Sequence, residues 1–216
     1  MSSPAPLPFE IHRSAQRGEM QKVVKWLRKE GSVDALCPIA RKGRAITSSL
    51  LHAAVSGCHL ELVRVLLKRG ASVDLRAASL GFTALMDAAG YGHTSILLVL
   101  LQHSANPDLQ SIDSGTALMV AAEGGQEACV KAPLRAQANP DLQFIHGGTA
   151  LMVAAEKGEE ACVQALLRAK ANPDLLDTEG QTALMLAAEG GQEACVQALL
   201  RAKANPDLQD VDGQTA

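Results

Sequence analysis

Aromatic residues are almost missing from this chain of 216 residues. Phe, Tyr and Trp together make up 2% of it, although 47% of the residues are hydrophobic. A single thick globular core with so few large side chains would be unusual. The abundance of Ala, Leu and Val instead favours thin layers of packed helices.

Two further absences bear on location. No uncharged apolar stretch approaches the ~20 residues that a membrane-spanning helix needs. The first eight residues are polar and rich in proline, and no apolar segment typical of a secretory signal follows them. We therefore expect an intracellular protein, cytoplasmic or nuclear, with no membrane partner.

The five cysteines show neither a disulfide framework nor a metal pattern. No Cys-x-x-Cys pair and no histidine cluster at zinc spacing occurs. Cys129, Cys162 and Cys195 lie 33 residues apart, which indicates one structural position repeated three times. We interpret these thiols as reduced side chains in a buried core.

Motifs of catalysis are absent as well. The chain contains no Gly-x-x-x-x-Gly-Lys-Ser/Thr, His-Glu-x-x-His or Gly-x-Ser-x-Gly string. Residues 210–213 resemble the start of a calcium loop, but the later ligands are missing, and residues 177–180 form a parallel turn of the same kind. We expect no catalytic residues, no cofactor and no metal site, and hence no enzyme.

What the chain does have is a repeat. Thr-Ala-Leu-Met begins at Thr83, Thr116, Thr149 and Thr182, always 33 residues apart, and Thr215 begins another copy in register. Each full copy continues with a pair of small residues, a second apolar stretch and Ala-Asn-Pro-Asp. A fixed period of this length predicts an elongated array of stacked units, and it outweighs any estimate of domain number from length alone.

The unit resembles an ankyrin repeat, whose signature is Thr-Pro-Leu-His-x-Ala-Ala. The stretch from Ser49 to Val55 reads Ser-Leu-Leu-His-Ala-Ala-Val and keeps the signature histidine at His52, and Ile11–Ala15 is a weaker first copy. Later copies have Ala in place of the proline and Met in place of the histidine. The resemblance covers about Glu10 to Ala216. It implies an all-α fold, an ankyrin-repeat solenoid of stacked helix-turn-helix units joined by β-hairpin-like fingers.

On this register we expect a disordered tail over residues 1–8 and one ankyrin-repeat domain over residues 9–216. The chain stops within a unit, so it looks truncated relative to a longer array. The expected repeats 1 to 6 cover 9–44, 45–77, 78–110, 111–143, 144–176 and 177–209, followed by a truncated unit, 210–216.

Each repeat is expected to hold a first helix, such as residues 84–89, a turn at a glycine and a second helix. Pairs of alanines in the first helices should let these helices approach one another closely, which bends a stack and makes one face concave. Pro133 stands where repeats 5 and 6 have Leu166 and Leu199, and it predicts a kinked or broken second helix in repeat 4. The first finger is longer than the others, and we interpret residues 35–48 as a mobile surface loop.

Charge is divided unevenly along the chain. Residues 1–104 carry 13 Lys or Arg and 7 Asp or Glu, a net charge of +6, whereas residues 105–216 carry 7 and 16, a net charge of −9. A basic half is compatible with an acidic partner or a nucleic acid, and Arg41, Lys42 and Arg44 form a short cluster there. We favour the alternative that most of the basic residues lie on solvated faces of second helices.

The resemblance implies that binding is made by the finger tips and the exposed ends of the first helices. Aromatic residues are rare in this chain and often anchor interfaces, so Phe82 and Tyr91 are expected as anchors. Together with the acidic residues nearby, they suggest a partner with an apolar anchor and a basic flank. The candidate partner-binding residues are Leu80, Phe82, Asp87, Tyr91, Ile112, Asp113, Val120, Glu123, Ile145, His146, Val153, Glu156, Lys157, Thr178, Glu179, Leu186 and Glu189.

A repeated framework with varied tips is typical of a scaffold with a reading surface, although recent duplication with drift would leave the same pattern. We predict a non-catalytic scaffold for protein–protein interaction, a monomer that binds a partner protein through a concave surface of fingers and first helices. One alternative is the substrate-recognition arm of a larger enzyme or of a ubiquitin-ligase adaptor. A less favoured one is nucleic-acid binding through the basic N-terminal half.

Overall fold

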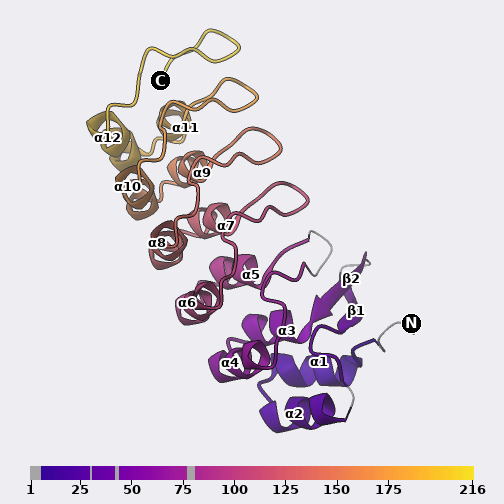
Figure 1. Ribbon diagram of the computed structural model, residues 1–216. Coiled ribbons are helices and arrows are strands. Elements are labelled where there is room, and N and C mark those ends of the chain that lie inside the picture. Colours follow the sequence, from indigo (N-terminus) through magenta and orange to yellow (C-terminus); the bar gives the residue numbers. More distant parts are fainter. Residues whose placement is uncertain (1–5, 30, 42–43, 77–80) are drawn as a thin grey trace. The chain divides into compact units, whose positions relative to one another are not determined.

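A computed structural model describes residues 6–29, 31–41, 44–76 and 81–216, and it describes side chains in these ranges except at residues 40–46. The described residues form twelve short helices and one β-hairpin (Figure 1). They fall into two compact parts, which we call the N-terminal half (Met1–Asn106) and the C-terminal half (Pro107–Ala216). None of the described helices has the length and apolar character needed to cross a membrane.

Each half contains helix pairs in which a first helix of seven or eight residues is followed by a second helix of nine. The N-terminal half comprises α1 (Phe9–Gln16), α2 (Met20–Arg28), β1 (Leu36–Arg41), β2 (Arg44–Ser49), α3 (Leu50–Ser56), α4 (Leu60–Lys68), α5 (Ala84–Gly90) and α6 (Thr94–Gln102). The C-terminal half comprises α7 (Ala117–Glu123), α8 (Glu127–Arg135), α9 (Ala150–Glu156), α10 (Glu160–Arg168), α11 (Ala183–Glu189) and α12 (Glu193–Arg201).

A serine or threonine begins every first helix from α3 onward. The hydroxyl oxygen of Thr149, for example, accepts the backbone N–H of Met152 at 3.3 Å, which satisfies one of the donors left open at a helix start. Ser49, Thr83, Thr116 and Thr182 make the same bond in their repeats. The 33-residue spacing of the threonines therefore becomes a 33-residue spacing of helix starts, as the sequence predicts.

Small side chains fill the space between first helices. Ala121, Ala122, Ala154 and Ala155 have no exposed surface. In the C-terminal half, α9 packs more extensively against α7 and α11 than α10 packs against α8 and α12. The predicted close approach of first helices is confirmed there.

The repeated cysteines lie in the core, as predicted. Cys129, Cys162 and Cys195 are each fully buried on the second helices. Burial raises the pKa of the Cys162 thiol to about 11 and also raises that of Cys195, with nearby glutamates adding to both shifts. These two groups are therefore protonated thiols at neutral pH, and they pack as small apolar side chains.

Residues 36–41 and 44–49 do not form the mobile loop that we expected. Strands β1 and β2 pair in antiparallel register from Leu36 opposite Ser49 to Arg41 opposite Arg44. The pairing gives the longer finger its own backbone hydrogen bonds, which a loop would have to make with water. Lys42 and the side chains of Arg41 and Arg44 lie outside what the structure describes, so the role of the basic cluster stays a prediction.

The N-terminal tail meets this hairpin. Residues 1–5 lie outside the described ranges, but Leu7 is buried, and its N–H donates to the carbonyl oxygen of Leu36 at 3.0 Å. The packed part of the chain therefore begins two residues before Phe9, inside the segment that we expected to be a disordered tail.

Pro133 does not break the second helix of repeat 4. Helix α8 runs through it to Arg135 and has the same length as α10 and α12, nine residues. Pro133 lies in the last turn, so it removes one intrahelical hydrogen bond but leaves little helix beyond it to displace. Its carbonyl oxygen accepts the N–H of Ala138 at 3.0 Å, and this bond closes the end of the helix. The prediction of a broken helix is therefore wrong.

Candidate functional site

The fingers of the C-terminal half share one geometry. Each is closed by a backbone hydrogen bond across four residues, as between the N–H of Phe144 and the carbonyl oxygen of Gly148 at 3.0 Å. The residue before the one whose carbonyl oxygen accepts this bond has a left-handed backbone. Glycine stands there in three fingers, as Gly147, Gly180 and Gly213, and Ser114 is the one residue with a side chain at this position.

Neighbouring fingers are joined through their backbones. The N–H of Ile145 donates to the carbonyl oxygen of Asp113 at 3.3 Å, and the N–H of Thr178 donates to that of His146 at 3.0 Å. The N–H of Val211 donates to the backbone carbonyl oxygen of Glu179 at 3.1 Å. The four finger tips therefore stand in a fixed register, one repeat after another.

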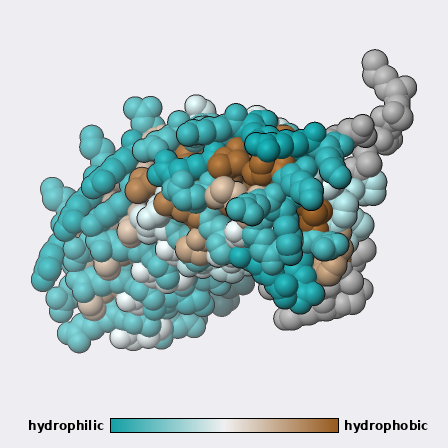
Figure 2. Space-filling view, turned by 90° about the horizontal axis from the view of Figure 1, so that it is seen from below, coloured by the Kyte–Doolittle hydropathy of each residue, from teal (hydrophilic) through white to brown (hydrophobic). Residues whose placement is uncertain are grey.

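The side chains at equivalent tip positions point into solvent. We call Ile112, Ile145, Thr178 and Val211 the tip row, and all four are β-branched. Ile112 is 66% exposed, Ile145 64% and Val211 72%. Large hydrophobic side chains are rarely so exposed in the described chain, and the face shown in Figure 2 is hydrophilic over most of its area.

The structure exposes 11 of the 17 predicted binding residues. Leu80 lies outside the described residues. Phe82, Asp87, Val120, Val153 and Leu186 are half-buried. The remaining residues are exposed: Tyr91, Ile112, Asp113, Glu123, Ile145, His146, Glu156, Lys157, Thr178, Glu179 and Glu189.

Phe82 and Tyr91 do not form one aromatic anchor. Phe82 precedes the residue that caps α5, and its carbonyl oxygen accepts a hydrogen bond from His52 Nε2 at 3.0 Å. Tyr91 follows the other end of α5, and its ring stacks on that of His93 with centroids 5.6 Å apart. The two aromatic side chains therefore belong to opposite ends of a seven-residue helix.

Carboxylates gather on the fingers and the ends of the first helices of the C-terminal half. Glu123, Glu156 and Glu189 are the exposed last residues of α7, α9 and α11. Further exposed carboxylates follow the tip row, and they belong to Asp113, Glu179 and Asp212.

The cations of this half lie elsewhere. On the fingers and first helices of the fully described C-terminal half, Lys157 is the only Lys or Arg, and it pairs with Glu156 at 3.0 Å, which raises the pKa of Lys157. The others lie on the second helices or in the turns directly after them: Lys131, Arg135, Arg168, Lys170, Arg201 and Lys203.

In the N-terminal half, the favoured interpretation of the basic residues is confirmed for α2 and α4. Lys22 pairs with Glu19 at 2.7 Å, and Arg64 pairs with Glu61 at 3.5 Å. The basic residues on or next to these second helices are all exposed: Lys22, Lys25, Arg28, Lys29, Arg64, Lys68 and Arg69.

Sequence reasoning missed the role of the aspartates in Asn-Pro-Asp. Asp141 Oδ1 accepts the backbone N–H of Asn172 in the next repeat at 2.9 Å, and Asp174 accepts that of Asn205 at 2.8 Å. Asp74 and Asp108 make the same bond to Asn106 and Asn139. The signal was available, because the aspartate and the asparagine recur together at 33-residue spacing, and the donor to each aspartate is the asparagine of the next repeat.

Sequence reasoning also left Val211 and Asp212 out of the candidate surface. They lie 33 residues after Thr178 and Glu179, which were included. The period alone would have assigned them to the last finger tip.

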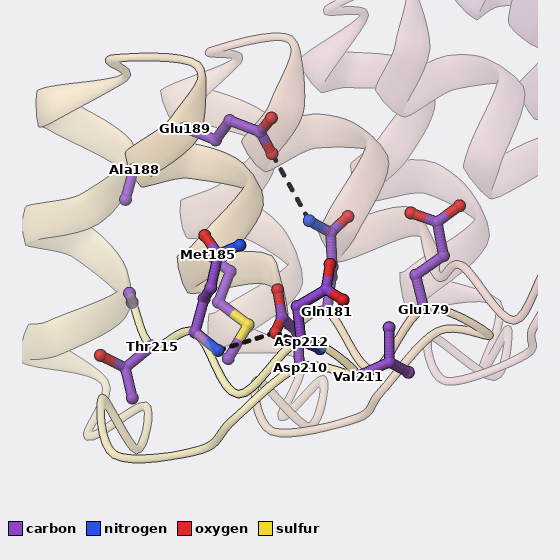
Figure 3. A pocket seen from close by; sticks show the side chains of 11 residues that line it. Glu179, Gln181, Met185, Ala188, Glu189, Asp210, Val211, Asp212 and Thr215 are labelled. Carbon is purple, nitrogen blue, oxygen red and sulfur yellow. Dashed lines mark hydrogen bonds between the residues drawn. The ribbon is translucent and has the colours of Figure 1, made fainter.

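A hollow of about 440 Å³ lies between α11 and the last two fingers (Figure 3). Met185, Ala188 and Val211 line it together with the carboxylates of Glu179 and Glu189. Ala188 is exposed, whereas the equivalent residues Ala122 and Ala155 are fully buried. The hollow therefore corresponds to the place that the next helix pair fills in the preceding repeats. Among the described residues, no group of three or more His, Cys, Asp or Glu side chains is placed to hold a metal ion.

Comparisons with known proteins agree on the architecture. The family model of ankyrin repeats (3 copies) matches residues 11–113, 103–175 and 118–212. The crystal structure of the ankyrin repeat domain of Bcl-3, a member of the IkappaB protein family, is similar over 98% of this chain and 93% of that one, with a TM-score of 0.82 and 25% sequence identity.

Curated relatives match a shorter stretch. Palmitoyltransferase ZDHHC13 from Mus musculus and from Homo sapiens is 41% identical to this chain over 61 residues, which is 28% of this chain. The matched stretch spans 10% of the length of those two proteins.

Proposed function

This chain belongs to the ankyrin-repeat family, and from that premise we propose that it is a non-catalytic module that binds a partner protein through its fingers and first-helix ends. Ankyrin repeats are in general modules of protein–protein interaction. The proposal adds which surface of this chain is used and that no reaction takes place on it.

The observation that carries the proposal is the contrast between framework and tips. In the C-terminal half, the capping threonines, the alanine pairs of α7 and α9 and the second-helix cysteines recur unchanged from repeat to repeat and are buried. The residues that vary between repeats, such as Asp113, His146 and Glu179, are exposed in a fixed register. A rigid framework that presents varied side chains binds with little ordering cost, because the surface is already in place.

Site-specific photocrosslinking tests this proposal. A benzoyl-phenylalanine at position 145, on the tip row, should form adducts with a discrete protein in an extract from the source cells. The same group at position 164, a partly exposed residue of α10 away from the fingers, serves as the control and should form none. Equal labelling from both positions, or labelling from position 164 alone, would contradict the assignment of the binding surface.

A second candidate function is the substrate-recognition arm of a larger enzyme. The similarity to part of a palmitoyltransferase favours it, because that enzyme carries a matching stretch within a chain about ten times longer than the match. Mass mapping of the endogenous protein separates the candidates. A protein with a catalytic domain beyond the repeats supports the arm, and a protein of 22.6 kDa contradicts it.

A further inference from the structure

We propose that the tip row of the C-terminal half docks a basic segment of the partner protein, one that carries Lys or Arg next to aliphatic side chains. The inference rests on the proposed function and adds the chemical class of the partner.

The tip row offers an apolar contact that costs little to use. Ile112, Ile145 and Val211 each expose about two thirds of their surface, and the backbone hydrogen bonds between fingers hold them in register. β-Branched side chains have few rotamers to lose when a partner binds. Aliphatic side chains of a partner can therefore pack against the row without rearranging it.

The charge around the tip row selects among partner segments that carry aliphatic side chains. Each of Ile112, Thr178 and Val211 is followed directly by an exposed carboxylate. The C-terminal half carries a net charge of −9, and its cations lie on or after the second helices, apart from Lys157, which Glu156 pairs. The surface therefore attracts cationic side chains and repels an acidic segment.

The glutamates at the ends of the first helices border the same surface. In repeat 6, Gln181 Nε2, at the base of the finger, donates to Glu189 Oε2 at 3.4 Å (Figure 3). This bond ties the end of α11 to the finger. Glu123 and Glu156 hold the equivalent positions at the ends of α7 and α9. A segment lying along the tip row therefore has the carboxylates of Glu179 and Glu189 beside it in repeat 6.

A selection from a phage-displayed library of random dodecapeptides tests the inference on the full chain. The expected peptides carry a net positive charge and aliphatic residues. Their affinity should fall about tenfold with Ile112→Ser and Ile145→Ser together, because two apolar contacts are lost. It should also fall with Glu123→Gln and Glu179→Gln together. The matched control is Glu160→Gln with Glu193→Gln, which removes the same charge from second helices and should change the affinity less than twofold.

The outcomes separate this inference from the proposed function. If the selected peptides depend on the tip row but are neutral or acidic, the proposed function stands and the basic partner is wrong. Equal losses from the two pairs of glutamate substitutions would mean that net charge alone attracts the peptides, and the assignment to this surface would be wrong. If no selected peptide depends on the tip row, both proposals fail.

Discussion

The same left-handed backbone conformation recurs at one position after the second helices. Gly70, Ser104, Gln137, Lys170 and Lys203 all have φ between 64° and 83°. In this conformation the N–H of Lys170 donates to the carbonyl oxygen of Leu167 at 3.0 Å. The N–H of Ala171 donates to the carbonyl oxygen of Leu166 at 3.1 Å, and the two bonds close the helix end. In this conformation the Cβ atom crowds the following carbonyl oxygen, and only glycine has no Cβ. Four of the five ends therefore carry strain of about 1–2 kcal/mol.

Replacing Lys170 by Gly should therefore stabilise the protein. Relief of strain is opposed by the greater freedom of glycine in the unfolded chain, and we expect a net gain of about 1 kcal/mol in the free energy of unfolding. Urea titration measures it. Lys170→Ala keeps the strained backbone and should give no such gain, and Gly70→Ala should destabilise. A gain from alanine equal to that from glycine would refute the explanation.

His52 is the one signature histidine placed at a capped helix start. It is 3% exposed; Ser49 Oγ lies 2.8 Å from its Nδ1, and its Nε2 donates to the carbonyl oxygen of Phe82. Burial, which disfavours the charged ring, lowers the pKa of His52 to about 4, although the bond to Phe82 opposes the shift. The ring is therefore neutral in the folded protein at pH 7.

Stability should decrease as the pH falls from about 6.5 towards 4. In that window the unfolded chain binds a proton at His52 and the folded chain does not, which favours unfolding by up to about 3 kcal/mol. His52→Met places the residue found in repeats 3 to 6 at this position and should remove most of that dependence. Part should remain, because burial also lowers the pKa of His12. Urea titrations at pH 5 and 7 compare the two proteins, and the same pH dependence in both would contradict the prediction.

At the scale of helices and fingers, the repeats are coupled by hydrogen bonds from one repeat to the next as well as by packing. The carboxylate of Asp141 caps the N–H of Asn172, and the Gln143 amide donates to Leu176 O at 2.9 Å in the next finger. The amide of Gln110 reaches Gln143 O at 3.0 Å in the same manner. These bonds fix the register between neighbours, which apolar packing alone specifies weakly.

Asp141→Ala should cost about 1 kcal/mol of unfolding free energy, because the backbone N–H of Asn172 loses a charged acceptor at a solvated site. Asp207 has the equivalent place in repeat 6, and within the described chain no later repeat supplies a donor to it, so Asp207→Ala is the matched control and should be nearly neutral. Chemical denaturation of both variants decides the matter. Equal effects would mean that the cross-repeat bond contributes nothing.

Helix α8 is the one described second helix with a proline inside it, although it is not broken. Pro133→Leu should restore a hydrogen bond and place the side chain that is fully buried at Leu166 and Leu199. We expect a gain of about 1 kcal/mol, the worth of one hydrogen bond in the last turn, seen as a higher melting temperature in calorimetry. The reciprocal change, Leu166→Pro, should lower it. A melting temperature unaffected by Pro133→Leu would show that the proline has no cost in this turn.

At the scale of the whole molecule, the architecture was predictable because one short unit recurs. The 33-residue spacing of Thr83, Thr116, Thr149 and Thr182 is sufficient to place the first helices, and the spacing of the cysteines is sufficient to place core positions. The β1–β2 hairpin was not predictable, since residues 35–48 have no counterpart in the other repeats. The continuity of α8 depends on how late in the helix Pro133 falls and on its neighbours. Helix propensities assign a cost to the proline itself and do not include this context.

The candidate surface was predictable in outline for the same reason, because register carries tip positions from one repeat to another. Two details were not. The separation of Phe82 from Tyr91 follows from the length of α5, and the cross-repeat role of the aspartates depends on which backbone N–H each faces. Both are matters of three-dimensional placement between elements.

The central claim is that framework positions carry the fold while the tip row is free for a partner. Urea unfolding of the triple variant Ile112→Ser, Ile145→Ser, Val211→Ser tests it most directly, with the buried Leu151→Ala as the reference. The account predicts that the triple variant stays within about 0.5 kcal/mol of the parent protein, as exposed substitutions do, and that Leu151→Ala loses about 2–5 kcal/mol. A loss from the triple variant as large as that from Leu151→Ala would mean that the tips hold the fold together, and the claim would be wrong.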